Sequence, residues 1–133
     1  MKKILLAILL AGLLCTVVFA EEAITNLTGT WEGTSMQHKK EAGFKTGETV
    51  TTWVIKEQDG RMFYGEKVWV LDGKKHTESF SGIISLDNKH FYMADHINGY
   101  VTGDIVSEDK IAVYYIEEGK DAKAIFIELN KVK

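Results

Sequence analysis

The pattern that most constrains the fold is a series of alternating apolar and polar runs separated by tight-turn dipeptides. Met62–Leu71 lies between Asp59-Gly60 and Asp72-Gly73, and Asn98-Gly99 comes directly before Tyr100–Val106. Glycine adopts positive φ at no steric cost, which hairpin turns require. Successive side chains of a strand point to opposite faces, so a period of two is typical of a half-buried strand. The pattern predicts an all-β chain of successive hairpins.

Followed along the chain, the same pattern predicts eight strands. They cover Leu27–Ser35, Thr49–Glu57, Met62–Leu71, His76–Leu86, His90–His96, Tyr100–Val106, Ile111–Glu117 and Ala122–Leu129. Strands joined by tight turns pair with their sequence neighbours, which predicts an antiparallel up-and-down meander. Eight such strands can close into a barrel, because closure removes exposed sheet edges. The interior of an eight-stranded barrel is wide enough to be packed solid or to hold one small ligand.

One predicted connection is long. Met36–Glu48 contains two glycines and one large apolar residue, Phe44. Long loops in compact domains are often lids or binding loops. Two hypotheses therefore stay open for this segment, a binding loop and a mobile solvated loop.

The N-terminus has the three-part layout of a secretory signal peptide. A basic Met1-Lys2-Lys3 start precedes the apolar stretch Ile4–Val18, and Val18 and Ala20 supply small residues before the expected cleavage point. The apolar stretch is shorter than the roughly 20 residues that span a bilayer, so an uncleaved anchor is the less favoured alternative. We predict a signal peptide over 1–20, cleaved after Ala20, and one barrel domain over 21–133 without stable membrane insertion. The protein would be secreted or located in the periplasm or cell envelope.

Composition excludes several classes of protein. Lys plus Arg number 16 against 19 Asp plus Glu, for a net charge of −3, and Arg61 is the single arginine. Nucleic-acid binding needs a basic face, so no nucleic-acid partner is predicted. The single cysteine, Cys15, falls within the predicted signal peptide. The domain that follows has no disulfide and must rely on its hydrophobic core.

The opening of the domain resembles a known group of barrels. Gly29-Thr30-Trp31 on the first predicted strand, followed by an eight-strand meander, is similar to the calycin group of lipocalins, avidins and fatty-acid-binding proteins. The resemblance implies that Trp31 plugs the closed end of the barrel, with Gly29 and Gly33 as further structural residues. The late arginine that packs on this tryptophan in lipocalins has no counterpart, and Lys131 or Lys133 could substitute for it only in part.

An aromatic residue stands two positions before a glycine three times, so that both share a strand face. The pairs are Trp31 with Gly33, Phe63 with Gly65 and Phe80 with Gly82. Glycine at such a position lets a strand bend or lets a bulky neighbour lie over it. We interpret the pairs as barrel corners, each with its core aromatic residue.

Aromatic side chains carry the functional hypothesis. The predicted ligand-binding residues are Trp53, Trp69, Tyr64, Phe80 and Tyr92 as lining, with Phe44 as a lid. Burial of apolar ligand surface would drive binding of a small, largely apolar or aromatic molecule in the barrel mouth. Lys67 and Glu66 interrupt the two faces of Met62–Leu71. A buried charge needs a partner, so either residue could face the ligand.

Two alternatives belong to other classes. A packed, ligand-free barrel could act as an interaction module through an outer face or through the 36–48 segment, with a partner that the sequence does not identify. A barrel enzyme could use His96 and Asp95, but no nucleophile–base set is recognisable, so catalysis is the less favoured hypothesis. His90 and His96 share a strand face, yet the four histidines lack the usual ligand spacing. No metal site and no cofactor are predicted.

Overall fold

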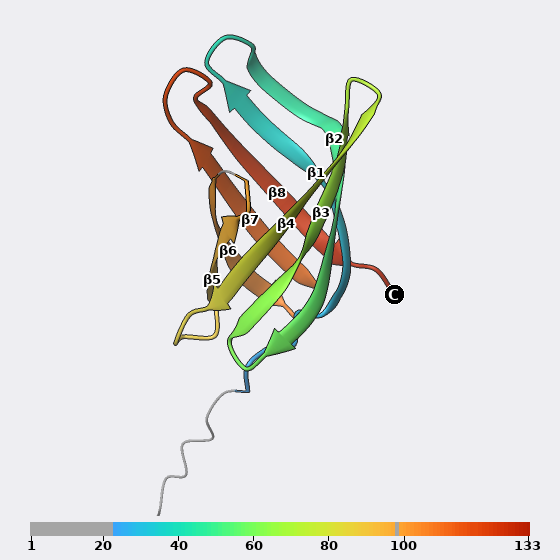
Figure 1. Cartoon of the computed structure of the whole chain (residues 1–133), viewed down its shortest axis with the longest axis vertical. Helices are drawn as coiled ribbons and strands as arrows, with labels where there is room; N and C mark the ends of the chain where they lie inside the picture. The colour runs from blue at the N-terminus through green and yellow to red at the C-terminus, as the bar shows by residue number, and fades with distance from the viewer. Residues whose placement is uncertain (1–22, 98) are drawn as a thin grey trace, which may run out of the picture.

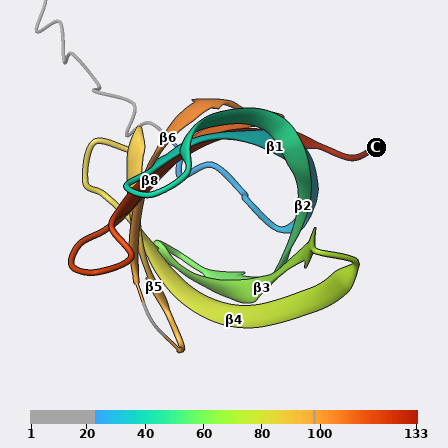
Figure 2. The same ribbon diagram turned by 90° about the horizontal axis from the view of Figure 1, so that it is seen from above.

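The computed structural model describes residues 23–97 and 99–133, and these form one closed antiparallel barrel with no helix. The strands are β1 Gly29–Lys39, β2 Gly43–Asp59, β3 Met62–Leu71, β4 Lys74–Ile84, β5 His90–Asp95, β6 Tyr100–Ser107, β7 Lys110–Glu117 and β8 Lys123–Lys131. Each strand pairs with the next, and β1 pairs with β8 to close the ring (Figures 1 and 2). The prediction of an all-β, eight-stranded up-and-down barrel is confirmed. The predicted signal peptide over 1–20 lies outside the described residues.

The prediction of a long loop over Met36–Glu48 was wrong. β1 continues to Lys39 and β2 begins at Gly43, so most of this segment is a hairpin arm with a short turn. The arm stays extended because its backbone is paired on two sides. Met36 pairs with Thr46 across the hairpin and with Phe126 of β8. A shift of register between Thr34 and Met36 interrupts the sequence alternation at the point where the strand was expected to end.

One end of the barrel is a packed apolar core. The fully buried side chains that build it are Leu27, Trp31, Trp53, Phe80, Ile84, Phe91, Ile111, Val113 and Leu129. The segment before β1 lies across this end (Figure 2). Trp31 donates its indole Nε1–H to the Leu27 carbonyl at 2.8 Å, and Lys131 Nζ lies 5.2 Å from the Trp31 ring centroid. Lys131, near the end of the sequence, therefore packs on Trp31 in a cation–π contact.

Glycines at the closed end leave room for aromatic rings of the neighbouring strand. A Cβ added at Gly82 would lie 2.2 Å from Phe63 Cζ, and one at Gly103 would lie 2.1 Å from Phe91 Cζ. Phe63 and Phe91 in turn meet edge to face, with centroids 6.0 Å apart. The close approach of the Phe63 ring to the backbone requires glycine at Gly82.

At the opposite end the β1–β2, β3–β4 and β7–β8 hairpins project beyond the body of the barrel (Figure 1). The inward-facing positions of the same strands turn from apolar to polar toward this end. On β3 the inward series runs Phe63, Gly65, Lys67 and Trp69, so a lysine occupies an interior position. The change of side-chain chemistry divides the interior into a closed apolar half and an open polar half.

Candidate ligand-binding cavity

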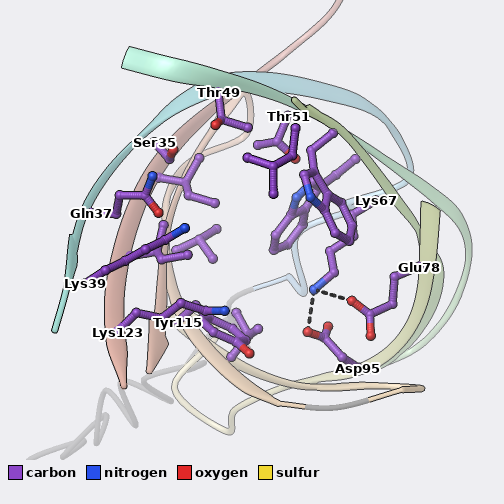
Figure 3. Close-up of a pocket in the computed structure, with 17 residues that line it drawn as sticks. Ser35, Gln37, Lys39, Thr49, Thr51, Lys67, Glu78, Asp95, Tyr115 and Lys123 are labelled. Carbon is purple, nitrogen blue, oxygen red and sulfur yellow. Dashed lines mark hydrogen bonds and ion pairs between the residues drawn. The ribbon is translucent and has the colours of Figure 1, made fainter. Parts of the chain in front are cut away.

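The open half of the barrel contains a cavity of about 200 Å³ (Figure 3). Its lining comes from all eight strands, because every second residue of each strand points inward. The lining residues are Ser35, Gln37, Lys39, Thr49, Thr51, Trp53, Lys67, Trp69, Leu71, Glu78, Asp95, Val101, Val113, Tyr115, Lys123, Ile125 and Ile127. Trp53 also belongs to the closed-end core, so it lies where the two halves meet.

The structure separates the aromatic residues that the sequence grouped as a site. Trp53 and Trp69 line the cavity. Phe80 is fully buried in the core, with its ring centroid 5.3 Å from that of Trp53. Tyr64 and Tyr92 are 45% and 53% exposed on the outer face and do not line the cavity. Phe44 is 87% exposed and packs against His38 rather than over the mouth.

A charged cluster forms one wall of the cavity. Lys67 of β3 pairs with Asp95 of β5 and, at 3.2 Å, with Glu78 of β4. The side chains of Lys67, Glu78 and Asp95 are only 12%, 10% and 1% exposed. Glu66, the other residue that interrupted β3, faces outward and pairs with Lys56 at 2.7 Å. Of the two charged residues, Lys67 is therefore the one that faces the cavity.

Asp95 is the most deeply buried charge of this wall. Burial raises the pKa of the Asp95 carboxyl, and the hydrogen bond and charge of Lys67 act against that rise, while the charge of Glu78 adds to it. One oxygen accepts a hydrogen bond from Lys67, but the other, Oδ1, has no partner within the described residues. Trp53 Nε1 is the second buried polar atom there without a partner. Buried polar atoms in proteins are nearly always paired, so both atoms require an explanation.

A second charged group lies across the cavity. Lys39 of β1 is directly opposite Lys123 of β8 in the register, and both side chains reach inward (Figure 3). Lys123 pairs with Glu117 at 2.7 Å, and Tyr115 donates to Glu117 at 2.8 Å. The hydrogen bond from Lys123 is the main cause that lowers the pKa of Glu117. Burial, followed by that bond to Glu117, raises the pKa of Tyr115. Lys39 forms no ion pair within residues 23–97 and 99–133.

Sequence reasoning missed most of these polar residues as a site. Glu78 stands two positions before Phe80, Asp95 two after Met93, and Glu117 four after Val113, so each shares the inner face with a core residue. The signal that could have identified them is a polar residue at an even number of positions from a core residue of the same strand, because such a residue faces the barrel interior. Only Lys67 was noticed for this reason.

Several large apolar side chains are exposed on the outer surface of the barrel. The strand registers place seven outward-facing residues, one from each strand except β2, side by side in one row around the barrel, which we call the outer apolar row. It consists of Met36, Phe126, Tyr114, Thr102, Tyr92, Ile83 and Met62. A shallow groove, also lined by Phe44 and Ile116, adjoins its β1 and β8 end.

The residues of the catalytic and metal hypotheses do not converge. Asp95 faces the cavity, whereas His96 Nε2 lies 2.9 Å from Ser81 Oγ at an exposed position. His90 pairs with Asp87 and Asp104, and His76 stacks on Trp69. Nowhere in the described part of the chain do three or more potential ligands gather to hold a metal ion. No helix among residues 23–97 and 99–133 has the length and hydropathy needed to span a membrane.

Comparison with known proteins identifies the architecture. No family model and no curated protein matches the sequence. The solved structures that resemble the barrel include the following two. A redesigned β-barrel is 10% identical, with a TM-score of 0.61 over 86% of this chain and 100% of that one. A de novo designed fluorescence-activating β-barrel is 15% identical, with a TM-score of 0.53 over 82% of this chain and 96% of that one. At such low identity the likeness is one of fold alone.

Proposed function

We propose that the protein binds a small, largely apolar or aromatic molecule in the cavity of its open half. The observation that carries the proposal is the cavity itself, since protein interiors are normally packed without such space. A cavity of 150 Å³ lined by apolar side chains can take up benzene. About 200 Å³ therefore suits a single ring with substituents. Trp53, Trp69 and the aliphatic residues of β8 supply the apolar contact area, and the polar wall supplies orientation.

The setting of this activity is part of the same proposal. The N-terminal pattern supports export, with the barrel acting outside the cytoplasm after cleavage at Ala20. The Gly29-Thr30-Trp31 opening, with Trp31 buried at the closed end, supports a relationship to the calycin group. In this proposal the protein acts by non-covalent binding alone.

The test is saturation-transfer NMR with p-cresol as the probe. Thr49 lines the cavity, so Thr49→Phe would fill part of it, whereas Thr77→Phe places the same ring on the exposed outer side of β4. We expect saturation transfer to p-cresol in the wild type and in Thr77→Phe, and its loss in Thr49→Phe. Equal transfer in Thr49→Phe and the wild type would contradict the proposal. So would a wild type that shows no transfer to p-cresol or to any of the four single-ring probes described in the next subsection.

The outer apolar row supports a second candidate function, contact with a second copy of this chain. Ile83 and Tyr92 are adjacent members of that row and are about half exposed. Sheets bury apolar faces by packing on one another, and most soluble oligomers are symmetric assemblies of identical chains. This is the form of the interaction-module hypothesis that the surface favours.

Sedimentation velocity over a wide concentration range tests the second candidate. Tyr92→Lys places a charge within the row, and Val70→Lys places one at an equally exposed position outside it. We expect a wild-type dimer that Tyr92→Lys dissociates and Val70→Lys leaves intact. A monomer at all concentrations would exclude this candidate and leave the cavity proposal untouched.

A further inference from the structure

The charges of the cavity are unequally divided between two opposite walls. On the β3–β5 wall, the single ammonium of Lys67 faces the two carboxylates of Glu78 and Asp95. Across the cavity the proportion is reversed, as two ammoniums, Lys39 and Lys123, face the single carboxylate of Glu117. Each group is thus one charge out of balance, with opposite sign, and Figure 3 shows the two lysines reaching toward the Lys67 wall.

Unpartnered atoms occur at the places where the imbalance lies. Asp95 is 1% exposed, yet its Oδ1 lacks a hydrogen-bond donor within the described residues. Lys39 has no ion-pair partner in the same part of the chain, and its charge acts only at longer range on Glu117. Leaving a buried carboxylate oxygen without a donor is costly, because the desolvation of the group is not repaid.

The ion pairs within each wall do not balance the charges of that wall. Lys67 already serves Asp95 and Glu78 together. Lys39 and Lys123 are directly opposite neighbours in the sheet, an arrangement in which like charges repel. A molecule that brought a cation to the first wall and an anion to the second would satisfy both at once.

We propose that the cavity takes a small aromatic molecule with a cationic nitrogen at one end and an anionic oxygen group at the other. This inference rests on the proposed function and names its ligand class. The cationic N–H donates to Asp95 Oδ1, and the anionic group accepts from Lys39. The ring lies between them against Trp53 and Trp69, and Trp53 Nε1 donates to an acceptor atom of the molecule. The size of the cavity limits the molecule to about one ring.

Four single-ring probes separate the contributions of the two ends. They are 4-(aminomethyl)benzoate, which carries both charges, benzylamine, benzoate and toluene. We measure their affinities by saturation-transfer NMR titration near neutral pH. A charge-assisted hydrogen bond is worth enough to change affinity about tenfold or more. We therefore expect 4-(aminomethyl)benzoate to bind at least about tenfold more tightly than either singly charged probe, and toluene to bind most weakly.

Two variants assign the ends of the probe to their walls. Asp95→Asn keeps the shape of the side chain and removes its charge, with Asp121→Asn on the exposed β7–β8 turn as the control. Lys39→Gln removes the unpaired ammonium, with its exposed neighbour Lys40→Gln as the control. Asp95→Asn should weaken benzylamine and leave benzoate unchanged, and Lys39→Gln should do the reverse. Circular dichroism establishes that each variant is folded.

The outcomes distinguish this inference from the proposed function. Toluene bound as tightly as 4-(aminomethyl)benzoate, or benzoate bound more tightly than the doubly charged probe, would overturn the ligand class while leaving a binding cavity in place. Failure of all four probes and of p-cresol would overturn the proposed function itself. The comparison of probes on the wild type decides the matter even if a variant fails to fold.

Discussion

The two halves of the barrel interior are built from the same strands but differ in chemistry. In the closed half, rings such as Phe63, Phe80 and Phe91 pack on each other and on strand glycines. In the open half, the corresponding positions hold Lys67 and Asp95, next to a cavity. Buried ion clusters seldom stabilise a protein more than apolar residues of similar size would. The comparison teaches that the closed half supplies the stability, and that the charges of the open half need another explanation than stability.

The largest expected effect comes from truncating a closed-half ring. Phe80→Ala removes a fully buried side chain and leaves a cavity, so we expect a loss of about 3–5 kcal/mol in the free energy of unfolding. Phe44→Ala is the matched control, because the same change at an exposed ring should alter that free energy by less than about 0.5 kcal/mol. Urea denaturation measures both. Equal losses in the two variants would refute the division into a stabilising and a functional half.

The second largest effect is expected from removing the lysine of the charged wall in the open half. Lys67→Met leaves Asp95 and Glu78 buried without a counterion, and we expect a loss of about 3 kcal/mol in the free energy of unfolding. A triple variant with Lys67→Met, Asp95→Leu and Glu78→Met should regain most of that loss, because no buried charge remains. Urea denaturation compares the two. If the triple variant were as unstable as the single one, the cluster would be a source of stability, against our comparison.

The smallest expected effect is a pH dependence with opposite signs at two carboxyls of the open half. The pKa of Glu117 is lowered by its hydrogen bonds, so its stabilising contribution is present above the ordinary glutamate pKa and lost as pH falls through the folded-state pKa. The pKa of Asp95 is raised by burial, so its contribution is complete below the ordinary aspartate pKa and lost as pH rises through the folded-state pKa.

Denaturation of the wild type, Glu117→Gln and Asp95→Asn between about pH 2 and pH 7 measures these contributions. At higher pH the wild type should be more stable than Glu117→Gln, and this difference should shrink as the pH falls into the acid range. Relative to Asp95→Asn, the wild type should lose stability as the pH rises. Parallel pH profiles for the three proteins would contradict the assignment of either carboxyl.

Sequence reasoning predicted the strand order, and on β3 it also identified the residues that share a face. The alternation placed Lys67 on one face of the strand and Glu66 on the other, and the barrel turns the Lys67 face inward. It was wrong about the 36–48 connection, because the pairing of β1 with β8 that keeps the arm extended is a contact between the two ends of the domain. Local alternation carries no information about such long-range pairing.

The candidate site was harder to predict than the fold. Tyr64 and Tyr92 were chosen for their aromatic character, yet each lies on the outer face of a strand whose inner face carries its own aromatic residues. With rings on both faces, alternation alone does not decide which face is buried. The cavity is instead lined by polar residues, of which the sequence had pointed only to Lys67 as a possible ligand contact and to Asp95 as a possible catalytic residue.

The amino-acid sequence by itself determined the class of fold, because turn residues and a period of two act over a few neighbouring positions. The resemblance of its opening to the calycin group added the expectation of a structural Trp31, which the structure buries completely. Only the tertiary structure decided that Lys67 meets Asp95 and Glu78, and that Lys39 faces them from the opposite wall. These residues are far apart along the chain, and their encounter follows from the closure of the barrel and the registers of its strands. A cavity is a property of that closed geometry.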